Sequence, residues 1–146
     1  MLLPTITSRC QKIRFKPVKK EEIIRYLETE KKVKKETAAA AAGLAKGSLG
    51  LAFELAGDFE NFKKNINLLD RLIKSDLRGR FEKAREISAS PGERKRIVRD
   101  WLIHSASLPD KRLAGELMYL SNMVSKSQFN HRLAFENFLI NVEAVS

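Results

Sequence analysis

Along most of the chain, apolar residues recur at steps of three and four positions, which is the period of an amphipathic helix. From residue 58 onward, five such stretches follow one another, and each predicts a helix with one apolar face. The residues expected on these faces are Phe59, Phe62, Ile66, Leu69 and Ile73; Leu77, Phe81, Ala84 and Ile87; Ile97, Val98, Trp101 and Leu102; Leu113, Leu117, Leu120 and Val124; and Leu133, Phe135, Phe138, Leu139 and Val142. Residues 58–146 are therefore predicted to form a five-helix bundle.

Residues that favour the ends of helices separate these stretches. Asp76 is expected to cap the helix that follows it, and Ser90-Pro91-Gly92-Glu93 matches a capping box with proline at the first helical position. Pro109-Asp110 is expected to start the next helix. The boundaries of the predicted helices thus follow from residue types with known preferences for helix ends.

Residues 19–57 predict three shorter helices. The first contains Glu21 to Leu27 and carries its acids in the first turn, and the second runs from Glu36 to Lys46 through five consecutive alanines, with Gly47 as its stop. Ser48 is expected to cap a third helix that ends near Gly57. The residues expected to face inward on it are Leu49, Ala52, Phe53, Leu55 and Ala56. A helix stop followed by Asp58 predicts a hinge between the two bundles.

The N-terminal stretch has a different period. Polar and apolar residues alternate from Lys12 to Lys16, with Ile13 and Phe15 on one face, which predicts a half-buried strand. No later segment has the pattern of a strand that could pair with it. We therefore expect residues 1–18 to be the end of a fold that begins before this sequence. The predicted class is all-α, with a small three-helix bundle, a five-helix bundle and one short unpaired strand.

The composition of the chain excludes several classes of protein. The chain has 146 residues, of which 43% are hydrophobic, so a folded core is expected. No apolar run is as long as a membrane span, and we expect a cytoplasmic protein without a membrane partner. Cys10 is the single cysteine, which excludes an intrachain disulfide and a cysteine-based zinc site. His104 and His131 lie on different predicted helices without other ligands at metal-binding spacing, so no metal site is predicted.

The formal net charge of +10 raises the question of a nucleic-acid partner. Residues 1–36 contain eleven Lys and Arg against five Glu, and residues 71–99 contain ten against four acids. Acids and bases alternate in both blocks, which favours solvated helix faces. The dense cluster Lys31-Lys32-Val33-Lys34-Lys35 leaves a contact with phosphates or with an acidic protein as the alternative.

Three motifs occur in the order found in one protein family. They are Leu2-Leu3-Pro4-Thr5-Ile6 followed by Ser8-Arg9-Cys10, then Gly47-Ser48-Leu49-Gly50, and finally Asn130 with Arg132-Leu133-Ala134-Phe135-Glu136-Asn137-Phe138-Leu139. Together they resemble AAA+ clamp-loader subunits, in particular the delta-prime type of bacterial DNA polymerase III. The resemblance implies that residues 1–18 end an AAA+ core, residues 19–57 form a helical lid, and residues 58–146 form the collar that joins subunits into a ring.

The resemblance also implies a site. Arg9, with Ser8 and Cys10 beside it, would be an arginine finger that reaches the ATP and Mg²⁺ bound by a neighbouring subunit. A guanidinium suits this role because it is always charged and has a rigid fork of donors that matches phosphate oxygens. The implied partners are other clamp-loader subunits through the collar, and the sliding clamp and primed DNA as parts of the complex. No cofactor is expected in this chain itself.

Two observations bear on catalysis. Gly43 to Ser48 has the order Lys-Gly-Ser rather than the Gly-Lys-Ser of a phosphate loop, and no predicted strand precedes it. Gly50 stands where ATP-hydrolysing relatives tend to carry arginine. We therefore expect no enzyme activity from the chain alone and favour a delta-prime-like subunit. There are two alternatives. The chain could be a fragment of an ATP-hydrolysing gamma/tau-like or replication-factor-C-like subunit, or it could be a basic helical nucleic-acid-binding module.

Overall fold

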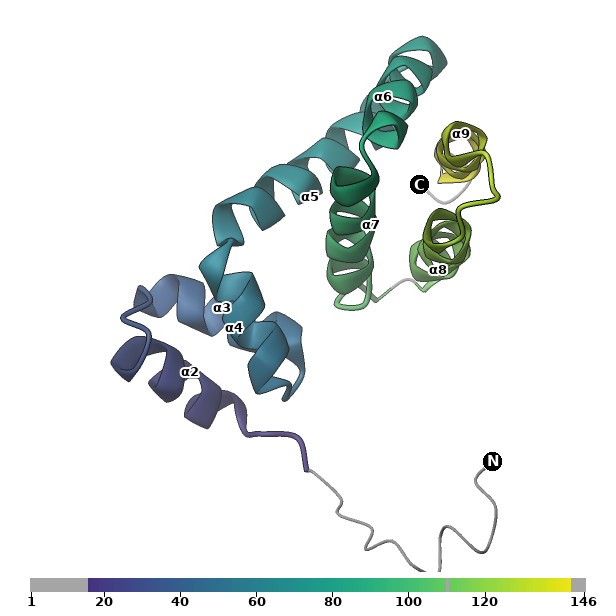
Figure 1. The fold of residues 1–146 in the computed structure, drawn as a ribbon. Coiled ribbons are helices and arrows are strands. Elements are labelled where there is room, and N and C mark those ends of the chain that lie inside the picture. Colours follow the sequence, from purple (N-terminus) through teal and green to yellow (C-terminus); the bar gives the residue numbers. More distant parts are fainter. Residues whose placement is uncertain (1–15, 110, 143–146) are drawn as a thin grey trace, which may run out of the picture. The chain divides into compact units, whose positions relative to one another are not determined.

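The computed structural model describes residues 16–109 and 111–142, and every regular element within them is a helix (Figure 1). These helices are α2 (Lys20–Thr29), α3 (Lys35–Ala45), α4 (Leu49–Gly57), α5 (Phe59–Lys74), α6 (Leu77–Ala89), α7 (Pro91–Ser105), α8 (Arg112–Ser125) and α9 (His131–Asn141). The all-α class is confirmed for this part of the chain. The strand predicted at residues 12–16 lies outside the described residues, apart from Lys16.

The chain divides into two compact units, residues 1–53 and residues 54–146, with the division inside α4. The sequence places the boundary a few residues later, at Gly57–Asp58, where α4 ends and α5 begins. The assignment of the two parts as lid and collar stays a prediction. Each unit is described by itself below.

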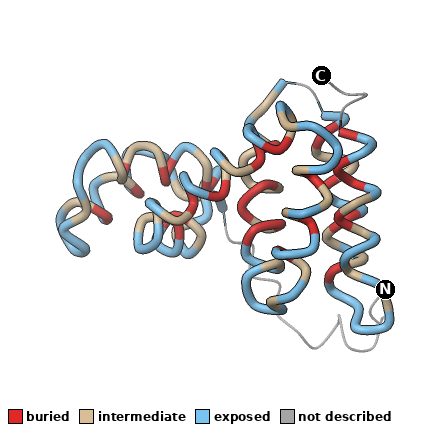
Figure 2. The backbone as a smooth tube through the Cα atoms, turned by 90° about the horizontal axis from the view of Figure 1, so that it is seen from above, coloured by how far each residue is buried: buried red, intermediate tan, exposed pale blue. Residues whose placement is uncertain are grey.

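In the first unit, α2 packs along α3 through small side chains. Ile23 and Leu27 of α2 are completely buried, as are Ala38 and Ala41 of α3 (Figure 2). Alanine allows helix axes to approach closely and is also the strongest helix former, so one residue type serves both the helix and its packing. The alanines predicted to form a helix therefore also give α3 a small buried face.

The turn between α3 and α4 requires glycine. Lys46 has φ +46° and Gly47 has φ +89°, so two successive residues are left-handed. A Cβ atom on Gly47 would lie 2.5 Å from Cβ of Pro17, and Val18 N donates to Gly47 O over 2.9 Å. Gly47 therefore ends α3 as predicted, because only glycine fits both the backbone angle and the close approach.

Helix α4 begins as the sequence predicts but exposes one predicted core residue. The hydroxyl of Ser48 accepts a hydrogen bond from Leu51 N over 3.3 Å, which confirms the cap. Ala52 and Leu55 are buried, whereas the Phe53 side chain is 48% exposed. The prediction that Phe53 faces inward is wrong, because residues one position apart on a helix point about 100° away from each other and Ala52 takes the inward direction.

The second unit has one continuous core formed by α5 to α9. Helix α6 packs against α9, α7 against α8, α8 against α9, and α5 against α7. Trp101 is completely buried, and its indole N–H donates to Asn65 O over 2.7 Å. Its ring lies 5.8 Å from the Phe138 ring and 6.3 Å from the Phe135 ring, the latter in an edge-on arrangement. The predicted core positions of α8, and Trp101 itself, are confirmed.

Some predicted details of helix ends and faces differ from the structure. Asp76 caps α6 by accepting from Gly79 N over 3.0 Å, and Pro91 is the first residue of α7, as predicted. The capping box at Ser90 is wrong, since the Ser90 side chain makes no cap hydrogen bond, and the exposed first turn of α7 leaves its N–H groups open to solvent. Leu77 and Leu133 are 49% and 60% exposed, so the prediction that they face inward is wrong: no other part of the described chain covers these two positions of the apolar faces.

Arg80 is buried at the place where α5, α6 and α9 meet, with only 3% of its surface exposed. Its Nε donates to Leu72 O and to Ser75 O, each over 3.0 Å, and Nη2 donates to Ile73 O over 2.7 Å. Its Nη1 donates to Leu139 O of α9 over 2.9 Å. The carbonyls at the end of a helix lack partners within it, so the guanidinium both caps α5 and fixes α9.

Replacing Arg80 by Met should keep the packing of the side-chain stem and remove the donors. Because the buried carbonyls would lose charged donors, we expect the free energy of unfolding to fall by about 1.5–3 kcal/mol. Urea denaturation followed by circular dichroism measures this change. Arg78→Met is the matched control on the same helix: Arg78 is exposed and pairs only with Glu82 in the described contacts, so its loss should change stability by less than about 0.5 kcal/mol. Equal effects of both changes would contradict the role of Arg80.

Limited proteolysis with a protease of broad specificity should cut first near residues 31–35 or near residues 56–60. The first range lies in the connection between two helices, and the second spans the junction of α4 and α5. The fragments can be identified by mass spectrometry of the intact products. First cleavage between residues 61 and 73, inside α5, would contradict the division of the chain.

Candidate functional site

The catalytic residue predicted from the sequence, Arg9, lies outside the described residues together with Ser8 and Cys10. The arginine-finger role therefore stays a prediction that rests on the motif. The described residues offer a different feature, a groove between two helices of the second unit.

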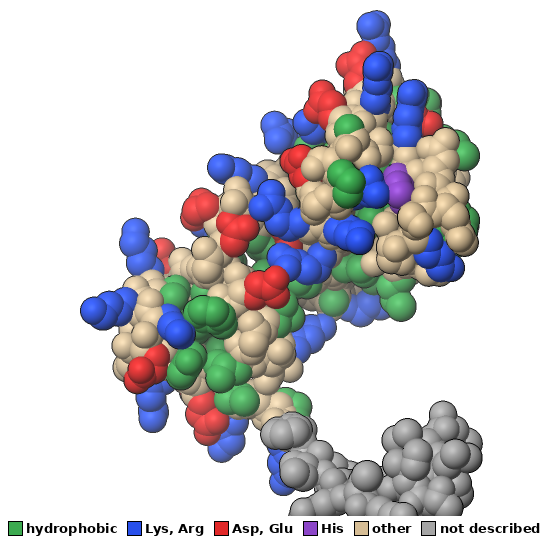
Figure 3. Space-filling view, viewed as in Figure 1, with side chains coloured by type: hydrophobic (Ala, Val, Ile, Leu, Met, Phe, Trp, Pro, Cys, Tyr) green, Lys and Arg blue, Asp and Glu red, His purple; other side chains and the backbone are tan. Residues whose placement is uncertain are grey.

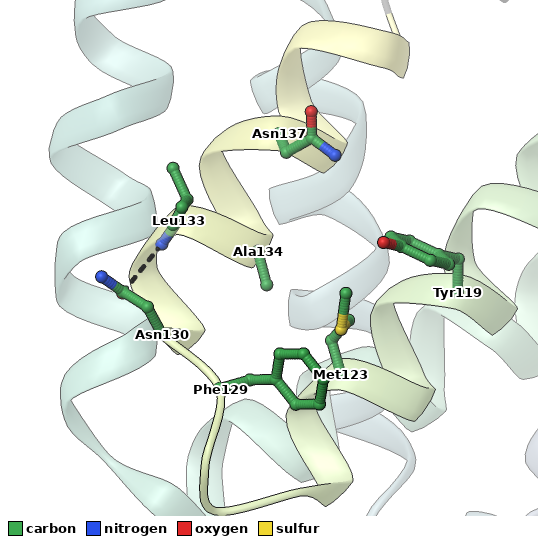
Figure 4. A pocket seen from close by; sticks show the side chains of 7 residues that line it. All are labelled: Tyr119, Met123, Phe129, Asn130, Leu133, Ala134 and Asn137. Carbon is green, nitrogen blue, oxygen red and sulfur yellow. Dashed lines mark hydrogen bonds between the residues drawn. The ribbon is translucent and has the colours of Figure 1, made fainter.

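The groove lies between α8 and α9 and has a volume of about 310 Å³ (Figure 4). Its lining residues are Tyr119, Met123, Phe129, Asn130, Leu133, Ala134 and Asn137. Tyr119 and Met123 project from α8 and Ala134 and Asn137 from α9 toward a common space, with the Phe129 ring at one end (Figure 4). The two helices pack against each other, and Leu120, Val124 and Phe135 are buried in the core of this unit.

The local sequence fixes the entry into α9. Asn130 caps the helix, because its Oδ1 accepts from Leu133 N over 3.1 Å. Lys126 Nζ lies 5.6 Å from the centre of the Phe129 ring, and Arg132 pairs with Glu136 over 2.7 Å along the outer side of α9. The connection between α8 and α9 is thus held by a cap and by a cation over an aromatic ring.

The chemistry of the groove suits binding rather than reaction. In the part of the chain that the structure describes, its lining contains no carboxylate, amine, thiol or imidazole. Tyr119 and Leu133 are more than half exposed, and Met, Tyr and Leu side chains beside two amides are the composition of a protein contact surface. The groove can accept apolar side chains of a partner while Asn130 and Asn137 offer hydrogen bonds.

A second set of polar groups lies inside the same unit. Asp100 is 2% exposed and accepts from Asn65 Nδ2 over 2.7 Å and from Arg99 Nη2 over 3.0 Å. Arg99 also pairs with Glu54. Each buried polar group in this set has a partner, so the network joins α5 to α7 without leaving a group unsatisfied.

The charge of Arg99 is held in place by this network. Burial acts to lower the pKa of Arg99, but the hydrogen bond and attraction from Asp100, and those from Glu54, raise it above its ordinary value. The guanidinium therefore stays protonated at neutral pH. A group with a fixed charge and fixed partners serves structure here, and it offers no proton for acid–base chemistry.

Neither histidine is among the residues that line the groove or that bond Asp100. His131 Nε2 lies 3.0 Å from Lys126 O, and His104 is half-buried in the last turn of α7. Within residues 16–109 and 111–142, no three His, Cys, Asp or Glu side chains lie close enough together to hold a metal ion. Across those same residues, none of the helices combines the length and the apolar character needed to cross a membrane.

Sequence reasoning missed the buried polar residues, although a signal was present. Asn65 lies three positions after Phe62 and four before Leu69, and Arg80 lies four positions before Ala84. A polar residue at the apolar period of a helix is the sign of a buried hydrogen bond. The groove itself had no such signal, because its shape depends on how α8 and α9 pack.

No family model, no curated protein and no solved structure matches this chain.

Proposed function

We propose that this chain is the lid and collar part of a delta-prime-like clamp-loader subunit. In this role it helps to assemble the ATP-driven ring that places the sliding clamp on primed DNA, and it supplies Arg9 as an arginine finger to a neighbouring subunit. ATP and Mg²⁺ are then bound by the neighbours. The chain itself contributes positioning and one charged group.

The proposal rests on the N-terminal motif. Leu2-Leu3-Pro4-Thr5-Ile6 precedes Ser8-Arg9-Cys10 at the spacing of the clamp-loader family, and the two weaker motifs follow in family order. A short tripeptide would carry little weight alone. Ten residues of matching context make the resemblance specific.

The structure is compatible with the proposal at the two other motifs. Gly47-Ser48 ends α3 and opens α4, the third described helix, as the family pattern requires of the last lid helix. Asn130 caps α9, whose Phe135, Phe138 and Leu139 enter the core. Both motifs therefore begin helices, which supports the alignment with the family.

The groove between α8 and α9 gives the collar assignment a physical basis. Leu133 belongs to the final motif, yet it is 60% exposed beside Tyr119 and Met123. Exposed apolar side chains around a groove mark surfaces that a partner covers. In the proposed ring the occupant is an apolar helix face of an adjacent collar.

The contribution of Arg9 would be electrostatic. When ATP is hydrolysed, negative charge develops on the oxygens of the transferred phosphoryl group, and a guanidinium from across the interface stabilises it. Such a finger changes the rate by roughly 10³–10⁵-fold in the phosphoryl-transfer enzymes where it has been measured. Because it acts in trans, ring assembly and hydrolysis become linked.

Arg9→Ala in the full-length protein should lower the ATPase rate of the reconstituted complex stimulated by clamp and DNA, and should leave ring assembly intact. Arg9→Lys should restore little activity, because an ammonium keeps the charge but lacks the planar fork. Steady-state ATPase and the elution volume on a sizing column measure the two effects. Normal ATPase in an intact ring would remove Arg9 from the mechanism, and a broken ring would give it a structural role.

Leu133→Glu should weaken ring assembly, because it places a charge in the groove that a neighbouring collar is proposed to cover. Leu77→Glu is the matched control, since Leu77 is similarly exposed at the start of α6 and lies away from the groove. Both variants should keep the wild-type melting temperature, because both side chains are exposed. Analytical ultracentrifugation of the reconstituted complex measures assembly. Equal assembly of the two variants would contradict a partner in the groove.

A further inference from the structure

The connection between α2 and α3, together with the first residue of α3, carries four exposed lysines. They are Lys31, Lys32, Lys34 and Lys35. The middle of the connection is fixed, because Val33 N donates to Leu27 O over 3.0 Å and Lys32 has the left-handed φ of +53°. The ammonium groups therefore extend from a turn of defined geometry.

An exposed aromatic ring lies beside this turn in the same unit. Phe53 of α4 is 48% exposed, and Lys31 Nζ lies 4.7 Å from the centre of its ring. On the face of the first unit seen in Figure 3, hydrophobic side chains are exposed beside Lys and Arg side chains. A cation beside an exposed ring combines the two kinds of group that single-stranded nucleic acid binds.

We propose that the lysine turn and Phe53 form a binding surface for single-stranded nucleic acid. One base stacks on the Phe53 ring, and the adjoining phosphates pair with the ammonium groups of the turn. The Lys31 side chain is long and flexible, so its ammonium moves from the ring to a phosphate when the base arrives.

The exposed aromatic ring of Phe53 favours single-stranded nucleic acid over the other polyanions that the lysines could attract. Glu30 and Glu36 flank the cluster, so charge alone makes this a modest attraction. An acidic protein segment would use the lysines and leave the ring unused. A duplex keeps its bases stacked on each other, whereas an unpaired base offers a flat face to the ring.

This inference does not depend on the clamp-loader proposal, because a chain that joins no ring would still bind a single strand. The test uses the full 146-residue chain and a fluorescently labelled twelve-nucleotide oligothymidylate, with anisotropy measured over a range of salt concentrations. Phe53→Ala should weaken binding about tenfold and leave the salt dependence unchanged, because it removes stacking and no charge. Lys34→Gln with Lys35→Gln should reduce the slope of log affinity against log salt by about 1.4, because two counterion-releasing contacts are lost.

The matched control is Lys63→Gln with Lys64→Gln, which removes two neighbouring exposed lysines from α5. Lys63 also lies over an aromatic ring, 5.1 Å from the centre of Phe59, but Glu60 pairs with it and Phe59 is half-buried. The control variant should bind the oligothymidylate with the wild-type affinity and with the wild-type slope of log affinity against log salt. The proposal is overturned if the control variant loses as much affinity and slope as the Lys34→Gln, Lys35→Gln variant. It is also overturned if Phe53→Ala binds the single strand as tightly as the wild type does, or if the wild type binds duplex DNA or polyglutamate as tightly as the single strand.

Discussion

The buried guanidinium of Arg80 donates hydrogen bonds to backbone carbonyls at the ends of both α5 and α9. It donates to Leu72, Ile73 and Ser75 at the end of α5 and to Leu139 in α9. Helix ends are the costly points of an all-helical unit, because buried carbonyls without partners destabilise the fold. By fixing α9 against the α5–α6 turn, Arg80 also fixes one wall of the α8–α9 groove. The packing of the second unit and its candidate binding surface therefore share one interaction.

The existence and order of the helices in residues 16–109 and 111–142 were predictable, because apolar spacing and caps such as Asp76 and Ser48 act locally. The apolar period signals that Arg80 is buried, but its bond to Leu139, 59 positions away, was not predictable because it depends on how the helices pack. The same holds for the bond between Asp100 and Asn65, which are 35 positions apart. Phe53 and Leu133 show the reverse error: a helical period identifies an apolar face, but it does not say whether another part of the chain covers it. Those two exposed residues now belong to the two proposed binding surfaces.

The two proposed surfaces differ in physical character, and this difference assigns them to different partners. The α8–α9 groove is apolar with two amides at its edge, which suits the side chains of a protein helix. The α2–α3 turn with Phe53 is cationic and aromatic, which suits phosphates and bases. The buried Asn65 and Asp100, with the partly exposed Arg99, join α5 to α7 and stabilise the scaffold. Function in this chain is therefore proposed to lie in surfaces rather than in a reaction centre.

The central claim is that this chain occupies a place in a clamp-loader ring, with its groove against one neighbour and Arg9 at the ATP of another. The most direct test is site-specific photocrosslinking of the full-length protein in a complex reconstituted from purified subunits. A photoreactive residue at position 133 should give one adduct, mapped by mass spectrometry to a collar helix of a single subunit. One at position 9 should give an ATP-dependent adduct near a phosphate loop. Adducts at neither position in an assembled complex, or failure of the protein to enter it, would contradict the account.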